Sequence, residues 1–213
     1  MNSIEFVNCS KNYLNHWLFK DFNYKFDIIA GNSYAFLGRN GSGKSTLTLM
    51  LVGQTSPTQG NVIWRDHEKQ IVTNQLSGLY TLSSPAMDFP EELTLSEWFY
   101  FQSGMNNLVG ISNPTELIEH SELPKKAINK TIQTFSSGMK QRLKLVYSFY
   151  SNSTLCVLDE PLSNLDNEGI KLYERFIEQK KNEKCLVVAS NREDEYFFVQ
   201  HKLKIESGII QPL

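Results

Sequence analysis

Residues 38–46, GRNGSGKST, lie between the apolar run SYAFL and the helix-like run KSTLTLMLV. The pattern G-x-x-x-x-G-K-[ST] between a strand and a helix is typical of a phosphate-binding loop. Its glycines let successive backbone N–H groups point inward, and the next helix adds its positive N-terminal end. We therefore predict that Lys44 reaches the β- and γ-phosphates of a nucleotide and that the Ser45 hydroxyl binds Mg²⁺. The predicted nucleotide contacts are Gly38, Asn40, Gly41, Ser42, Gly43, Lys44, Ser45 and Thr46.

A second motif, LCVLDEP (residues 155–161), places two carboxylates at the end of an apolar strand. Ligands of open α/β sheets bind at the carboxyl ends of the strands. Asp159 suits the magnesium site, and Glu160 suits a general base for an attacking water. An Asp-Glu pair alone is a weak signal, but beside a phosphate loop it indicates a nucleotide-hydrolysing site.

Apolar runs alternate with helical patterns along the chain. Several runs are continuously apolar, as in strands that are covered on both faces of a parallel sheet, so an α/β fold is predicted. Strands are expected at 3–7, 33–38, 61–64, 79–82, 155–159 and 185–190, and helices at 44–52, 94–102, 138–150 and 168–180. Residues about 85–150 read as an inserted, mainly helical subdomain, and the last residues read as a hairpin that turns at Ser207-Gly208.

Composition excludes several other classes of protein. The 213 residues carry a net charge of −2, so nucleic acid is not an expected partner. No run of about 18 apolar residues predicts a membrane span, and the N-terminal residues lack the pattern of a secretory signal. Three isolated cysteines, Cys9, Cys156 and Cys185, indicate buried free thiols and a reducing, cytoplasmic setting.

The segment TFSSGMKQRLKLVYSFY, residues 134–150, resembles the signature segment of ATP-binding cassette (ABC) ATPases. Ser136 is the expected N-cap of its helix, and Gly138 follows in the pattern. SNLD, residues 163–166, is similar to the D-loop of that family. The resemblance implies one ABC ATPase domain over residues 1–213, with a mostly parallel core sheet and an N-terminal antiparallel part. It also implies ATP and Mg²⁺ as ligands, and a head-to-tail dimer, either a homodimer or a heterodimer, in which Ser136 and Gly138 contact the partner's ATP.

The same resemblance implies an aromatic residue that stacks on adenine. Tyr13 stands at the matching position, and Trp17 is an alternative. A structural tyrosine is nearly as good an interpretation of Tyr13.

The signature segment lacks one glycine and the glutamine of the family pattern, and two positions that carry chemistry also depart from it. Asn191 stands where the family has a histidine at the γ-phosphate, and Ser83 or Ser84 stands where it has a glutamine that contacts Mg²⁺ and the attacking water. Asn can donate a hydrogen bond but cannot carry a positive charge or shuttle a proton, and serine is too short to reach the same point without a water. We therefore predict ATP hydrolysis that is retained, because Glu160 is present, but weakened.

These observations favour the ATP-binding and ATP-hydrolysing subunit of an ABC transporter. It is expected to be cytoplasmic and peripheral at the inner face of the membrane, bound to a separate transmembrane subunit. Most rings of the aromatic-rich segment FPEELTLSEWFYFQ, residues 89–102, are expected to fill the core of the helical subdomain. Consecutive aromatic residues on a helix face several directions, so at least one ring should be exposed or meet a partner, and this segment is the hypothesised contact with that subunit. The alternative is a soluble ABC-type switch that binds ATP with little turnover. A P-loop kinase of small molecules would explain the phosphate loop but not FSSGMKQR, LDEP and SNLD in sequence.

Overall fold

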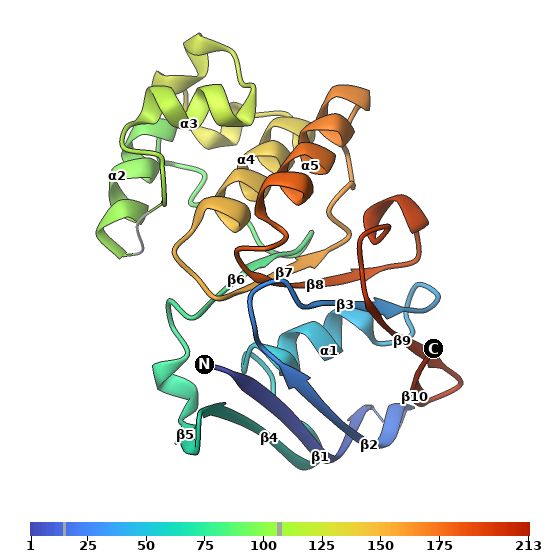
Figure 1. Cartoon of the computed structure of the whole chain (residues 1–213). Coiled ribbons are helices and arrows are strands. Elements are labelled where there is room, and N and C mark those ends of the chain that lie inside the picture. The colour runs from blue at the N-terminus through green and yellow to red at the C-terminus, as the bar shows by residue number, and fades with distance from the viewer. Residues whose placement is uncertain (15, 106–107) are drawn as a thin grey trace.

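Two β-sheets lie on opposite sides of helix α1 (Lys44–Leu51), and four further helices lie beyond the larger sheet (Figure 1). The structure is a computed structural model, and it describes residues 1–14, 16–105 and 108–213. Its larger sheet has the order β10-β9-β3-β8-β7-β6. The bounds of these strands are Ile209–Pro212, His201–Glu206, Ser33–Leu37, Cys185–Ser190, Leu155–Asp159 and Tyr80–Ser83.

All neighbouring strands of the larger sheet are parallel except β9 and β10. Successive residues of β7 and β8 face two different cores. Val157 and Val187 belong to the core that contains α1, whereas Cys156 and Val188 belong to the core under the helices. This confirms the predicted mostly parallel sheet, and it explains why the central strands are continuously apolar.

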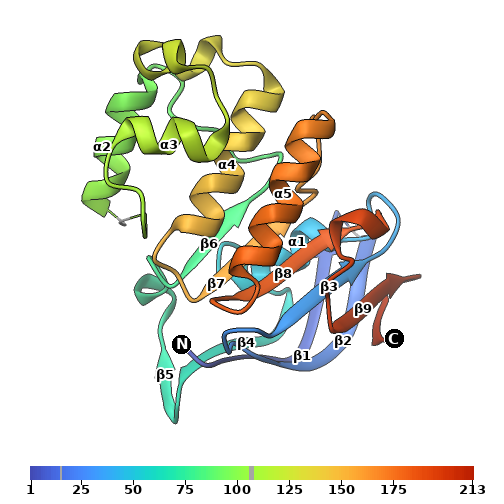
Figure 2. The ribbon, with the colours of Figure 1, turned by 45° about the horizontal axis from the view of Figure 1, so that its top comes forward.

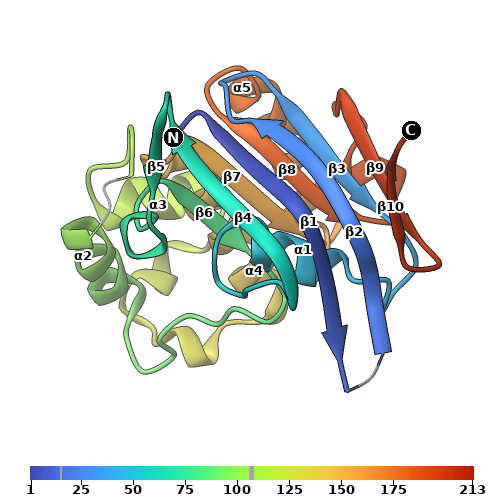
Figure 3. The same ribbon diagram turned by 90° about the horizontal axis from the view of Figure 1, so that it is seen from below.

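The smaller sheet is antiparallel, with the order β2-β1-β4-β5 (Figure 3). Its strands are His16–Asp27, Ser3–Tyr13, Gln59–Asp66 and Lys69–Ile71. The predicted N-terminal antiparallel part is therefore confirmed. Strand β2 was not predicted, although Phe22, Tyr24 and Phe26 alternate with polar residues in the period of two that marks a strand with one face in the core.

Helices α2 (Leu95–Met105), α3 (Pro114–Ser121), α4 (Ser137–Tyr150) and α5 (Asn167–Lys180) share a second hydrophobic core (Figure 2). Each predicted helix is present, with ends within three residues of those expected. Helix α3 is additional, and its N-cap is Asn113, whose side chain accepts from the backbone of Thr115 and Glu116. Short 3₁₀ turns lie at Thr73–Gln75, Lys125–Asn129, Ile132–Thr134 and Glu193–Glu195.

The C-terminal hairpin and the thiols also follow the predictions. Ser207 and Gly208 have φ values of 51° and 78°, the left-handed pair that a two-residue hairpin turn needs. All three cysteines are buried and free, and Cys156 lies opposite Leu186, so its side chain and that of Cys185 point to different faces of the sheet. Within the described residues, no helix combines the length and apolar character that crossing a bilayer requires.

Candidate nucleotide-binding site

Four predicted motifs meet at one edge of the larger sheet. Strands β3, β8, β7 and β6 are adjacent and parallel, so their carboxyl ends lie side by side. The phosphate loop follows β3, Asn191 follows β8, Asp159 ends β7, and Ser84 follows β6. Segments that are far apart in the sequence thus form a single site, at the edge where α/β sheets bind ligands.

The backbone of the phosphate loop adopts conformations that favour glycine. Gly41 and Gly43 have φ values of 80° and 106°. A Cβ atom on Gly38 would lie 2.6 Å from both the Ile205 carbonyl oxygen and the Ser42 hydroxyl, so only glycine fits there. The buried Lys44 ammonium donates to the carbonyl oxygens of Gly38, at 2.8 Å, and Arg39, at 3.3 Å. The loop therefore holds the Lys44 ammonium against its own backbone carbonyl oxygens. A bound phosphate would take the place of these oxygens as hydrogen-bond acceptors.

Asp159 is almost wholly buried, with 3% of its surface exposed. Its Oδ2 atom accepts from the Ser84 hydroxyl at 3.4 Å, and its Oδ1 atom has no hydrogen-bond partner among the described residues. Burial raises the pKa of this carboxyl group, while the nearby Ser45 hydroxyl lowers it. A buried carboxylate with one unpartnered oxygen beside a serine hydroxyl fits Mg²⁺, which prefers few protein oxygens and keeps sites for phosphate and water.

Glu160 is the next residue, and its backbone is left-handed, with φ of 49°. This conformation is uncommon for a residue with a side chain. Its N–H donates to the Ala189 carbonyl oxygen at 3.0 Å, and the Ser163 hydroxyl lies 3.4 Å from one of its carboxylate oxygens. The fold therefore ties the predicted general base both to the strand that carries Asn191 and to the D-loop.

The two unusual positions each contact another part of the predicted site. The Asn191 amide donates to the Asn40 side-chain oxygen of the phosphate loop at 3.4 Å. Of the two candidate serines, Ser84 contacts Asp159, whereas the buried Ser83 hydroxyl has no partner within the described residues. Ser84 is therefore the serine that occupies the turn beside the predicted metal ligand.

A cleft of about 630 Å³ adjoins the phosphate loop, and Trp17, Lys20, Gly41 and Ser42 contribute to its lining. Trp17 also carries the Lys20 ammonium over its ring, 4.7 Å from the centroid. Tyr13 is not among the lining residues of this cleft, and it is 47% exposed at the end of β1. Of the two aromatic candidates, Trp17 is thus the one whose side chain borders the loop.

Ser136 is the N-cap of α4, as predicted, because its hydroxyl accepts from the Met139 N–H at 3.2 Å. A Cβ atom on Gly138 would lie 3.0 Å from the Asn164 carbonyl oxygen, so the helix start packs closely against the D-loop. Ser136, Gly138 and Asn164 line a separate cleft of about 430 Å³. Within the described residues of one chain, this helix N-terminus and the phosphate loop line separate clefts.

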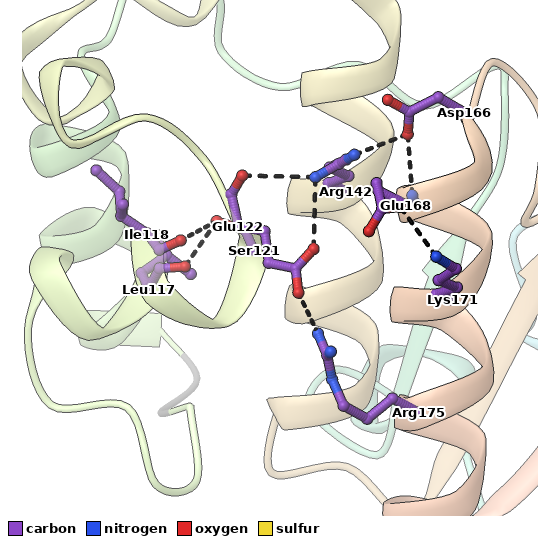
Figure 4. Close-up of polar contacts among 10 residues, drawn as sticks. Leu117, Ile118, Ser121, Glu122, Arg142, Asp166, Glu168, Lys171 and Arg175 are labelled. Atoms are coloured by element: carbon purple, nitrogen blue, oxygen red, sulfur yellow. Dashed lines mark hydrogen bonds and ion pairs between the residues drawn. The ribbon is translucent and has the colours of Figure 1, made fainter.

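Sequence reasoning missed an ion-pair network (Figure 4), and three of its members, Glu122, Arg142 and Asp166, line that cleft. The Arg142 guanidinium lies between the Asp166 carboxylate, at 2.7 Å, and the Glu122 carboxylate, at 3.6 Å. Arg175 binds the other side of Glu122 at 2.6 Å. Asp166 also caps α5 by accepting from the Gly169 N–H. The network joins the end of α3 to α4, α5 and the D-loop.

A buried carboxylate, Glu195, was missed as well. It is 1% exposed, and it accepts from the Leu162 N–H, at 2.9 Å, and from the Ser190 hydroxyl. Burial raises the pKa of this carboxyl group, and the hydrogen bond from Ser190 is the largest opposing effect. Glu195 thereby connects Leu162, the residue before the D-loop, to the last residue of β8, which Asn191 follows.

The aromatic segment of α2 has two faces. Trp98 and Phe99 are buried in the helical core, whereas Tyr100 and Phe101 are more than half exposed. The predicted exposed ring is therefore present. Phe101 also borders a groove of about 290 Å³ between α2 and α4.

Comparison with known proteins agrees with this geometry. Residues 22–163 match the family model described as ABC transporter. The chain is 31% identical over 170 residues to the lantibiotic transport ATP-binding protein SrtF of Streptococcus pyogenes, covering 79% of this chain and 72% of the relative. It is also 31% identical over 176 residues to the cytochrome c biogenesis ATP-binding export protein CcmA of Reclinomonas americana, covering 81% and 78%.

Its fold is similar to that of the dimeric bacterial ABC transporter cassette MJ0796, with a TM-score of 0.78, 19% identity, and coverage of 98% of this chain and 96% of that one. At this identity the likeness concerns the fold alone. Together with the matched family model and the phosphate loop, Asp159, Glu160 and the capped signature helix, these similarities show that the chain belongs to the ABC transporter family, as one of its ATP-binding proteins.

Proposed function

We propose that this chain binds and hydrolyses ATP as the nucleotide-binding subunit of an ABC transporter, and that ATP-driven pairing of two such domains moves a separate membrane subunit. The observation that carries the proposal is the meeting of the phosphate loop, Asp159, Glu160 and Asn191 at one sheet edge. SrtF is named for lantibiotic transport and CcmA for export in cytochrome c biogenesis, at equal identity to this chain, so no cargo is transferred from either.

The residues of the site have distinct proposed roles. Backbone N–H groups of the loop and Lys44 bind the phosphates, while Ser45 and Asp159 hold Mg²⁺, which neutralises phosphate charge when bound. Glu160 accepts the proton of the attacking water, and Asn191 donates a hydrogen bond to the γ-phosphate. The remaining proposed contacts are Trp17 or Tyr13 at the base, the rest of residues 38–46 at the phosphates, and Ser136 and Gly138 at the ATP of a second domain.

Hydrolysis is proposed to be slow. Loss of one preorganised contact to the transition state typically costs about 10²–10³ in rate. Asn191 and Ser84 each replace a stronger group, whereas ATP binding relies on backbone amides, Lys44 and the metal. Glu160 keeps its position next to Asp159, which supports retained rather than absent turnover.

The proposed assembly follows from surfaces. The signature cleft at Ser136 and the cleft at the phosphate loop share no lining residue, which supports the completion of each site by a second domain. The groove beside Phe101, with the exposed Tyr100, is the proposed contact for the membrane subunit, which would hold the chain at the cytoplasmic face of the membrane. We further propose that residues 1–213 form one ATPase domain with a helical subdomain at about 85–150.

A soluble ATP-dependent switch is the second candidate, and Asn191 favours it because it cannot act as histidine does. The test measures ATP binding and steady-state hydrolysis on the same samples of wild type and Glu160→Gln, with Glu178→Gln on the exposed side of α5 as the control. Turnover in the wild type and control, with binding but no turnover in Glu160→Gln, supports the motor. Equal ATP binding with negligible turnover in all three supports the switch, and lack of ATP binding refutes both.

A further inference from the structure

Lys144 lies on α4 where this helix runs beside β6 (Figure 2). Its ammonium donates to the Ser84 carbonyl oxygen at 3.0 Å. This is its single hydrogen bond within the described part of the chain. The side chain also borders the groove of about 290 Å³ that Asp88, Phe101 and Tyr147 help to line. Lys144 therefore lies between the proposed partner groove and the turn that follows β6.

Ser84 is held from two sides. Its carbonyl oxygen accepts from Lys144, and its hydroxyl donates to the Asp159 Oδ2 atom at 3.4 Å. The same hydroxyl accepts from the Ala86 N–H at 3.3 Å, which fixes its direction within the turn. The Oδ2 atom of Asp159 therefore accepts a hydrogen bond, while Oδ1 has no partner among the described residues.

We propose that Lys144 is a positioning residue for the magnesium site: by holding the Ser84 turn, it directs the Ser84 hydroxyl to Asp159 and leaves Asp159 Oδ1 for the metal. The inference rests on the proposed function. Residues that orient a metal ligand affect metal affinity by about 10–100-fold when they are removed. A charged donor suits this role, since hydrogen bonds from ionised groups are roughly twice as strong as neutral ones.

This arrangement indicates what Ser84 does at the position where the family has a glutamine. The serine is too short to contact both the metal and the water, but a serine held from behind by a lysine can still orient the metal carboxylate. It also gives the partner groove a path of two hydrogen bonds to the metal site, from Lys144 through Ser84 to Asp159. A ligand in the groove that displaces the Lys144 ammonium would release the Ser84 turn.

The test uses the full chain and follows ATP binding while Mg²⁺ is titrated. Lys144→Met keeps an unbranched stem of four heavy atoms but removes the ammonium donor. We expect it to raise the Mg²⁺ concentration for half-maximal metal-dependent binding by about tenfold, with metal-free ATP binding unchanged. Ser84→Ala should do the same, and the double variant should match either single one because both break one relay. Lys171→Met is the matched control, since this exposed lysine pairs only with Glu168 on α5 in the described residues.

Four results would overturn the inference. A wild-type magnesium requirement in Lys144→Met shows that the lysine does not position the site, and the proposed function then still stands. Effects of Lys144→Met and Ser84→Ala that multiply in the double variant show two independent actions. If Lys144→Met does not fold, Ser84→Ala carries the test, and a wild-type requirement there refutes the relay. Failure of the wild type to bind ATP with Mg²⁺ overturns the proposed function along with it.

Discussion

Comparing Glu195→Ala with Glu195→Gln should separate the stability that the hydrogen bonds of this buried carboxyl group contribute from the effect of its charge. Glu195→Ala leaves the Leu162 N–H without its partner and opens a gap beside Ser190. An unsatisfied buried donor costs about 1–3 kcal/mol, and the lost packing adds to it, so we expect a loss of about 2–4 kcal/mol in the free energy of unfolding.

Glu195→Gln should cost less than about 1 kcal/mol at pH 7. Its amide oxygen can accept from the Leu162 N–H, and its NH₂ group can donate to the Ser190 hydroxyl, which lies within 3.4 Å of the Arg192 carbonyl oxygen as an alternative acceptor. The glutamine also avoids the burial of an ionised group, which is the effect that raises the pKa of Glu195.

The raised pKa gives the comparison a pH dependence with a definite sign. Folding disfavours the ionised form of Glu195, so the folded state binds its proton more tightly than the unfolded state does. This penalty on the wild type is complete above the raised folded pKa, and it disappears as pH falls through that pKa toward the unfolded value. Wild type should therefore gain stability relative to Glu195→Gln on acidification.

Urea unfolding of wild type, Glu195→Ala and Glu195→Gln between pH 5 and 8 measures these differences. The reasoning is wrong if the glutamine variant loses as much stability as the alanine variant at pH 7. In that case the negative charge, rather than the hydrogen bonds to Leu162 and Ser190, would stabilise the fold. A wild type that loses stability relative to the glutamine variant on acidification would contradict the direction of the pKa shift.

Two more predictions use matched pairs of variants. Arg142→Met should lower the free energy of unfolding by about 1–2 kcal/mol because this half-buried arginine has two ion-pair partners and packs its stem. Arg175→Met, with one partner and a side chain that is 46% exposed, should change it by less than about 0.5 kcal/mol, and equal losses would contradict the network. Trp17→Ala should weaken ATP binding by about tenfold, which corresponds to the lower part of the free-energy range for stacking of a base on an aromatic side chain. Tyr13→Ala should leave ATP binding unchanged. The reverse order in a binding titration would assign the base to Tyr13.

Much of the site could be predicted from the sequence because each motif is local. Residues 38–46 carry their glycines, lysine and serine within one turn, and LCVLDEP carries a strand and its two carboxylates together. Helix caps are local too, so the sequence predicts Ser136 as the cap of α4. The structure confirms this cap through its hydrogen bond from the Met139 N–H. Patterns of this kind need only a strand, a turn or one helical turn to be recognised.

Strand β2 was not predicted, although Phe22, Tyr24 and Phe26 show the alternation of a strand. Its length follows from its pairing with β1. Strand formation depends on cross-strand neighbours more than on intrinsic preference. The same dependence on distant neighbours explains the choice between Ser83 and Ser84, since only the register of β6 against β7 shows which serine contacts Asp159.

By itself, the sequence determined that the chain holds a phosphate loop, an acidic strand end and a capped signature helix in an α/β order. The tertiary structure decided which of these meet. Lys144 and Ser84 are 60 residues apart, and Glu195 and Leu162 are 33 apart, so no local pattern reports their contacts. Buried polar groups must find partners wherever the packed core brings them, and for Lys144 and Glu195 those partners belong to other elements of the fold.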